Sequence, residues 1–146
     1  MIVFTSVVIG SDHAGFHLKE SIKEQLEALN ITVTDMGTHS TESCDYPLIA
    51  KEVCEKVLKD SGSCGILVCG TGIGMSITAN RFPGIRAALC ASEFQARATR
   101  KHNNANVLCL GERVTGFGVA QAMVEQFLST DFEGGRHQRR IDLIEN

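Results

Sequence analysis

The stretch from Gly65 to Ser76 constrains the fold more than any other part of the sequence. It begins as a continuous apolar run that ends at Cys69, which is the pattern of a parallel strand buried on both faces. Glycines then alternate at positions 70, 72 and 74, and the residues after them suit a helix. A strand, a tight glycine turn and a helix N-terminus, in that order, present backbone N–H groups to an anion. The stretch therefore predicts an α/β protein with a ligand site at the turn; the plainer alternative is a structural turn beside a buried cysteine.

The rest of the chain alternates short apolar runs with amphipathic segments. Strands are expected at residues 6–10, 31–35, 65–69, 85–91 and 107–110, with helices between them and a last long helix that ends at Leu128. This alternation predicts one domain, residues 1–146, with an α/β fold: a doubly wound, Rossmann-like, five-stranded parallel sheet with helices on both faces. Leu29 in the first long helix and Val119 in the last are both expected on the buried faces. The tail after the last long helix is glycine-rich and basic before a short apolar end.

Composition excludes several classes of protein. The chain has 146 residues, of which 43% are hydrophobic and 21% charged, and this is enough for one packed core. A net charge of -3 gives no general attraction to nucleic acid or to anionic membranes. The apolar runs are too short to span a bilayer, and the first residues lack the basic and hydrophobic regions of a signal peptide. We therefore expect a cytoplasmic protein with neither a nucleic-acid nor a membrane partner.

Six cysteines raise the question of disulfides or metal. There is no C-x-x-C pair and no Cys/His cluster with zinc-finger spacing. Cys64 and Cys69 are five residues apart on one expected strand, so they point to opposite faces of the sheet. Cys54, Cys90 and Cys109 lie within apolar patterns and are expected to be small buried hydrophobes. The cysteines therefore indicate a reducing compartment and no metal site.

Several polar residues follow the expected strands at one rim of the sheet. Asp12 and His13 come after the first strand, Cys69 and Thr71 at the third, and Arg113 after the fifth. The carboxyl ends of parallel strands share one rim, so these residues should converge. Each alone has an ordinary explanation, since Asp12 can be a helix N-cap, His13 a surface histidine and Arg113 a solvated charge. Their convergence favours a functional site.

Two nucleotide-binding motifs are excluded. A Rossmann fingerprint needs glycine where Met75 stands and usually follows the first strand, although Glu93 lies at about the expected distance. A Walker P-loop needs Gly-Lys-Ser/Thr, which does not occur. The glycine turn suits a small anionic or enediolate-like group instead. Arg136 and Arg140 in the tail would suit a phosphate, unless they are ordinary solvated charges.

Five motifs occur in an order typical of one family. They are Gly10-Ser11-Asp12-His13-Ala14-Gly15, Asp45-Tyr46-Pro47, Cys69-Gly70-Thr71-Gly72-Ile73-Gly74, Arg100-Lys101-His102-Asn103 and Gly134-Gly135-Arg136-His137-Gln138-Arg139-Arg140. Together they closely resemble ribose-5-phosphate isomerase type B, of the family shared with the galactose-6-phosphate isomerase subunits. The resemblance covers nearly the whole chain. The departures are a few extra N-terminal residues and Ser11 before the Asp-His pair.

The resemblance implies interconversion of ribose 5-phosphate and ribulose 5-phosphate, without metal or cofactor. It implies three catalytic residues: Cys69 moves a proton between C1 and C2, Thr71 assists proton movement on the sugar oxygens, and His102 opens the furanose ring. The phosphate would be bound by His13, Arg136 and Arg140, and the enediolate by N–H groups of the glycine turn. The full set of substrate-binding residues that it implies is Asp12, His13, Tyr46, Gly70, Thr71, Gly72, Ile73, Gly74, Asn103, Arg113, Arg136, His137 and Arg140.

The resemblance also implies a homodimer or homotetramer whose sites take residues from two chains. The tail, residues 129–146, is then expected to contact a neighbouring subunit. Two alternatives stay open. One is a hexose-phosphate isomerase of the same family, acting on allose or galactose 6-phosphate. The other is a non-catalytic phosphosugar-binding module, which the presence of Cys69, Thr71 and His102 together disfavours because binding alone needs no base.

Overall fold

The computed structural model describes all 146 residues and contains one parallel β-sheet. Its strands lie in the order β2-β1-β3-β5-β4, and every neighbouring pair is parallel. The central strand β3 is buried along its whole length, as its continuous apolar sequence predicts. The expected doubly wound, five-stranded parallel sheet is therefore confirmed. The strands are β1 (Ser6–Ser11), β2 (Thr32–Asp35), β3 (Ser63–Cys69), β4 (Ala87–Leu89) and β5 (Val107–Gly111).

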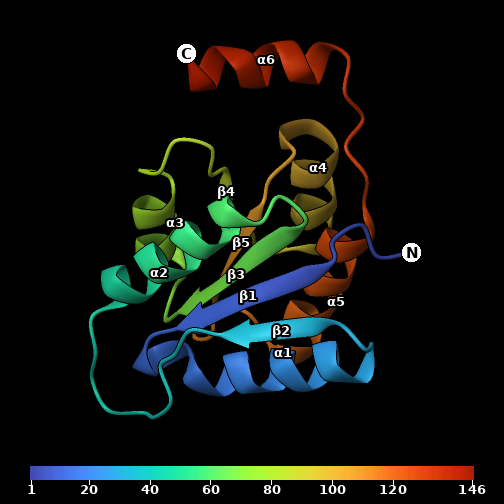
Figure 1. The fold of residues 1–146 in the computed structure, drawn as a ribbon. Helices are drawn as coiled ribbons and strands as arrows, with labels where there is room; N and C mark the ends of the chain where they lie inside the picture. The colour runs from blue at the N-terminus through green and yellow to red at the C-terminus, as the bar shows by residue number, and fades with distance from the viewer.

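Helices cover both faces of the sheet (Figure 1). One buried cluster packs α1, α4 and α5 on one face, and a second packs α2 and α3 on the other. The last helix, α6, stands apart from these layers beyond the end of α4 (Figure 1). None of the helices combines the length and the apolar character needed to cross a membrane. The helices are the short η1 (His13–Gly15), α1 (Phe16–Ala28), α2 (Tyr46–Lys59), α3 (Ile73–Ala79), α4 (Glu93–Asn103), α5 (Phe117–Ser129) and α6 (Arg136–Glu145).

The cysteines lie where the sequence pattern predicts. Cys64 belongs to the cluster on one face of the sheet and Cys69 to the cluster on the other. Cys54, Cys90 and Cys109 are buried, and all six cysteines are free. Burial raises the pKa of Cys54 to about 12 and that of Cys90 to about 11, so both remain thiols near neutral pH. These cysteines act as small core residues.

Two apolar residues expected in the core are exposed instead. Leu29 is 46% exposed because α1 ends at Ala28 and the chain turns away there. Val119 is also 46% exposed, because the buried stripe of α5 begins at Ala120 rather than at Val119. That stripe consists of Ala120, Met123, Val124, Phe127 and Leu128.

The C-terminal tail also differs from its expected form. It contains a ten-residue helix, α6, where the sequence pattern predicts only a basic tail with a short apolar end. His137 and Ile141 are its buried residues. Leu143 and Ile144 are about 70% exposed (72% and 69%), so α6 presents apolar side chains to solvent in the single chain.

A buried ion pair fixes the edge strand β2. The Nζ of Lys19, whose side chain is fully buried, donates to both carboxylate oxygens of Asp35 at 2.8 Å and also to the carbonyl oxygen of Thr38. Lys23 Nζ and the N–H of Gly37 donate to the same carboxylate, each at 2.9 Å. Burial by itself would raise the pKa of Asp35, but these hydrogen bonds lower it overall. The pair ties α1 to the end of β2.

Candidate active site

The glycine turn after β3 positions the Cys69 sulfur and the Thr71 hydroxyl. Gly72 has φ +79°, and a Cβ there would lie 2.9 Å from the backbone carbon of Leu110, so both conformation and space require glycine. The N–H of Gly72 donates to Cys69 Sγ at 3.1 Å. The N–H of Ile73, the first residue of α3, donates to Thr71 Oγ1 at 3.3 Å. Two N–H groups of the turn thus orient the side chains of Cys69 and Thr71.

The end of β5 supports the same turn. The N–H of Arg113 donates to the carbonyl oxygen of Gly70 at 3.0 Å. The Arg113 side chain lies over that glycine, because a Cβ on Gly70 would be 3.3 Å from Arg113 Nη1. Gly111 packs against the backbone of Thr71, where an added Cβ would be 2.5 Å from the carbonyl carbon. The turn therefore rests directly on the carboxyl end of β5.

The turn after β1 contributes a carboxylate and an imidazole. Asp12 Oδ1 accepts from the N–H groups of Ala14 at 3.0 Å and Gly15 at 3.1 Å, so Asp12 does cap η1. His13 Nδ1 accepts from the N–H of Cys44 at 3.2 Å. A ring nitrogen that accepts a hydrogen bond carries no proton, so the proton of this neutral imidazole is on Nε2. His13 is thereby left with one free donor.

These elements enclose a cavity of about 470 Å³, which we call the cysteine cavity. It lies at the carboxyl ends of β1, β3 and β5, where parallel sheets bind ligands. Tyr46, the first residue of α2, closes one side by packing on Gly74, where a Cβ would lie 2.6 Å from the tyrosine ring. The structure thus brings together five residues predicted to converge. The lining is Asp12, His13, Ala14, Tyr46, Cys69, Gly70, Thr71, Ile73, Gly74, Ile77 and Arg113.

Of the other predicted site residues, Gly72 lies in the glycine turn itself, and the rest lie at the end of α4 and on α6, away from the lining of the cysteine cavity. The rings of His102 and His137 stack with their centroids 4.6 Å apart, and His102 Nε2 lies 3.9 Å from Glu133 Oε1. We call His102, Glu133 and His137 the histidine cluster. Burial of His137 and the nearby charge of Arg136 lower its pKa. Within one chain, the predicted site residues therefore form two separate groups, the second being His102, Asn103, Arg136, His137 and Arg140.

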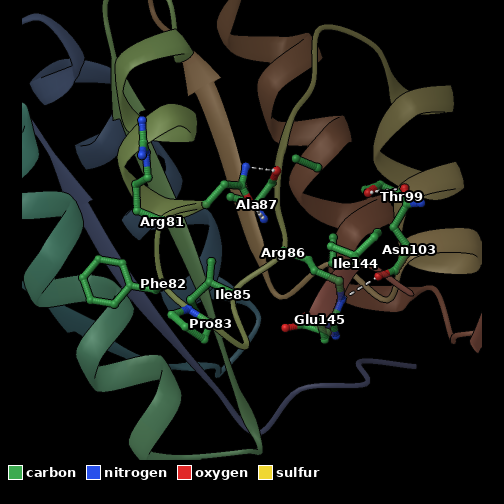
Figure 2. Close-up of a pocket in the computed structure, with 13 residues that line it drawn as sticks. Arg81, Phe82, Pro83, Ile85, Arg86, Ala87, Thr99, Asn103, Ile144 and Glu145 are labelled. Atoms are coloured by element: carbon green, nitrogen blue, oxygen red, sulfur yellow. Dashed lines mark hydrogen bonds and ion pairs between the residues drawn. The ribbon is translucent and has the colours of Figure 1, made fainter. Parts of the chain in front are cut away.

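One arginine links the two helices that carry the second group. Arg86 Nε donates to the carbonyl oxygen of Asn103 at 2.8 Å, and Nη2 donates to that of Asn104 at 3.1 Å. Its Nη1 donates to Glu145 Oε1 at 2.8 Å, and the N–H of Gly84 donates to Glu145 Oε2 at 3.2 Å. Figure 2 shows Arg86 between Asn103 and Glu145, at the edge of a second cavity of about 540 Å³. Arg86 thus joins the end of α4 to the end of α6.

The sequence pattern did not single out Cys44, Arg86, Glu133 or Glu145 as site-supporting residues. Cys44 acts through its backbone N–H, which no side-chain pattern reveals. Arg86 and Glu145 pair across 59 residues, so their spacing carries no local signal. Glu133 is a single acidic residue directly before the Gly134-Gly135 pair of a basic tail. This contrast in charge is the sequence feature that could have marked it as a site-supporting residue.

Comparison with known proteins decides the family. The model of a family described as Ribose/Galactose Isomerase matches residues 7–144 of the chain. The chain belongs to the ribose/galactose isomerase family. Ribose-5-phosphate isomerase B of Escherichia coli (strain K12) is 44% identical to it over 138 residues, which cover 94% of this chain and 93% of the relative.

Solved structures of the ribose/galactose isomerase family agree with this result. A ribose 5-phosphate isomerase from Thermotoga maritima has a TM-score of 0.94 and 52% sequence identity, covering 97% of both chains. Ribose-5-phosphate isomerase B from Mycoplasma genitalium with bound ribulose-5-phosphate has a TM-score of 0.93 and 44% identity, covering 99% of this chain and 96% of that one. The resemblance to ribose-5-phosphate isomerase type B that the sequence motifs indicate is thus confirmed.

Proposed function

We propose that the protein interconverts ribose 5-phosphate and ribulose 5-phosphate. The observation that carries this proposal is the cysteine cavity, where Cys69 Sγ and Thr71 Oγ1 lie on a turn of backbone N–H groups. Two relatives support it: the Escherichia coli protein is a ribose-5-phosphate isomerase B, and the Mycoplasma genitalium protein holds bound ribulose-5-phosphate. The reaction moves one proton between C1 and C2 of the open-chain sugar and needs no metal or cofactor.

The proposed chemistry begins with ring opening. His102 takes the proton of the anomeric hydroxyl and delivers a proton to the ring oxygen, which breaks the bond between C1 and that oxygen. The thiolate of Cys69 then removes the proton from C2, and the electron pair forms the enediolate. Thr71 passes a proton between O1 and O2, and Cys69 returns its proton to C1 to give the ketose. Carbon acids are weak, so the base needs fixed donors on the developing oxyanion, and the glycine turn offers them.

Phosphate binding falls to cationic and donor groups. His13 offers Nε2–H from the cysteine cavity, and Arg136 and Arg140 offer guanidinium groups that match phosphate oxygens. This contact is remote from the reacting carbons, so its binding energy can position them over Cys69. The remaining proposed contacts to the sugar are Asp12, Tyr46, Gly70, Gly72, Ile73, Gly74, Asn103, Arg113 and His137.

The complete site, in this proposal, is shared between two subunits. Within one chain the cysteine cavity and the group on α4 and α6 are separate. A homodimer in which residues 129–146 lie against the neighbour would bring His102 and the arginines of one chain to Cys69 of the other. The exposed Leu143 and Ile144 on α6 support such a contact, since apolar side chains favour burial.

Mixing two inactive variants tests both the activity and the shared site. Cys69→Ala and His102→Ala each remove one proposed catalytic group, so each homodimer should have lost most of its ribose 5-phosphate isomerase activity. When both are co-expressed, half of the dimers pair the two variants, and each such dimer has one intact site. We expect recovery to roughly a quarter of the wild-type activity, measured with a chelator present.

The outcomes separate the alternatives. No recovery on mixing would mean that each site lies within one chain and would overturn the shared site. Faster turnover of allose or galactose 6-phosphate by the wild type would assign the protein to a hexose phosphate instead. Phosphosugar binding without turnover of any of the three would identify a binding module.

A further inference from the structure

The histidine cluster has the donor set of a transition-metal site. His102 at the end of α4, Glu133 in the segment before α6 and His137 in the first turn of α6 each offer one ligand atom, and these atoms lie within 4.8 Å of one another. Ligand atoms around tetrahedral zinc are about 3.3 Å apart, given bonds of about 2.0–2.1 Å. Closing the cluster therefore requires the ligand atoms to approach by up to about 1.5 Å and the His102 ring to turn out of its stack on His137. The side chains of His102 and Glu133 are each 47% exposed and free to make these movements.

A second observation points to a ligand at the same place. His137 is only 6% exposed, and its Nε2 is buried without any hydrogen-bond partner. A buried polar nitrogen without a partner is unfavourable, and such groups usually mark a missing ion, water or ligand.

The three ligands sit on a framework that is already assembled. The N–H of Glu133 donates to the carbonyl oxygen of Lys101 at 3.1 Å, which places Glu133 directly beside His102. Arg86 joins α4 to α6 at a second point through Asn103 and Glu145 (Figure 2). A cation would therefore order side chains without having to bring their backbones together. Preorganisation of this kind reduces the free-energy cost of binding.

We propose that the histidine cluster binds one borderline divalent cation, with Zn²⁺ as the best match. Two imidazoles and one carboxylate favour zinc over magnesium or calcium, which prefer oxygen ligands. The fourth position is left to water. The guanidinium groups of Arg136 and Arg140 lie near enough to influence His137 and oppose a cation, so we expect micromolar rather than nanomolar affinity. The role of the site is inhibitory: bound zinc occupies the ring nitrogen with which His102 would move a proton, a consequence that rests on the proposed function.

The test uses a ligand residue that lies outside the proposed sugar-binding set. Zinc binding to the full-length protein is measured by titration calorimetry without substrate, and Co²⁺ is used for absorption spectra. We expect one Zn²⁺ per chain, tetrahedral Co²⁺ bands without a thiolate charge-transfer band, and at least tenfold weaker binding by Glu133→Gln. Glu125→Gln, which changes an exposed carboxylate on α5, serves as the matched control and should bind zinc as the wild type does.

The same variants are assayed for isomerase activity. Zinc inhibition of each variant is measured relative to its own metal-free activity, and the half-inhibitory zinc concentration of Glu133→Gln should rise by the same factor as its dissociation constant. Zinc inhibition that is equal in the wild type and Glu133→Gln, or a Co²⁺–thiolate band, would place the metal elsewhere, such as on Cys69, and overturn the proposal. Absence of zinc binding in calorimetry would also overturn it. Calorimetry does not depend on turnover, so the zinc-binding result stands even if the protein does not isomerise ribose 5-phosphate.

Discussion

Replacing Gly111 by alanine should lower the activity, although Gly111 is not among the proposed substrate contacts. The new Cβ would lie 2.5 Å from the carbonyl carbon of Thr71 and 2.7 Å from its Cα and oxygen. Ordinary contacts to a Cβ begin at 3.4 Å, so the two backbones must separate by about 1 Å. The contact is with backbone at the reactive turn, so no flexible side chain can absorb the shift. The turn carries Thr71 and, one hydrogen bond away, Cys69.

The expected loss follows from that displacement. A misplacement of about 1 Å in a catalytic constellation costs on the order of 100-fold in rate. Overpacking of this kind also costs roughly 1–3 kcal/mol of stability. For a domain of this size, that lowers the melting temperature by roughly 3–12 °C. Gly111→Ala should therefore stay folded at 25 °C while its kcat on ribose 5-phosphate falls by about two orders of magnitude.

The assay compares Gly111→Ala with Gly118→Ala. Gly118 lies in the first turn of α5, and a Cβ there would meet nothing within 4 Å. Alanine is better than glycine in a helix by about 0.8–1.0 kcal/mol, so this control should be fully active and slightly more stable. Melting temperature and kcat are measured on both. A folded Gly111→Ala variant whose kcat lies within threefold of the wild type would refute the dependence of the turn on this contact.

Two further predictions concern an ion pair and a proton transfer. Lys19→Met should reduce the free energy of unfolding at neutral pH by about 3 kcal/mol in denaturant titrations, because it leaves the largely desolvated carboxylate of Asp35, 13% exposed, with Lys23 as its remaining cation. The lowered pKa of Asp35 stabilises the fold above its unfolded pKa of about 3.9, so the difference from the wild type should shrink as the pH falls below that value, and a pH-independent difference would contradict this origin. His102→Ala should lose about 100-fold or more of its turnover of ribose 5-phosphate, but much less on erythrose 4-phosphate, which cannot form a furanose ring. Equal losses on both sugars would exclude ring opening as the role of His102.

The sheet and the cysteine cavity could be predicted from sequence because their signals are local. A continuous apolar run marks β3, and the parallel topology places Asp12, Cys69 and Arg113 at one rim once the strands are recognised. The order of the strands had no such signal, since the position of β5 between β3 and β4 depends on packing between distant segments. Local sequence patterns also do not show whether the residues of a site come from one chain or from two.

The errors on helices have physical causes. α5 carries apolar residues on more than one side, with Phe117 and Val119 exposed beside a fully buried stripe, so its sequence does not define the phase of the buried face. In α6, by contrast, the buried face is too small to give a clear apolar pattern. The helix buries only His137 and Ile141 against its own chain, which is too weak an apolar pattern to stand out from a basic tail. The histidine cluster went unrecognised because Glu133 and His137 meet His102 only after α6 has docked on α4.

The place of β5 in the sheet also governs the order in which a newly made chain can fold. β3 can pair with β1 as soon as both have left the ribosome, but its other edge stays open until β5 follows. At roughly 5–20 residues per second, the ribosome needs about 2–8 s to travel from Cys69 to Val107. Only then do Glu112 and Arg113 donate to the carbonyl oxygens of Cys69 and Gly70, each at 3.0 Å. A chain stalled in that interval exposes the unpaired backbone N–H and C=O groups along one edge of the mainly apolar strand β3, so this is the stage of synthesis at which aggregation or chaperone capture competes with folding.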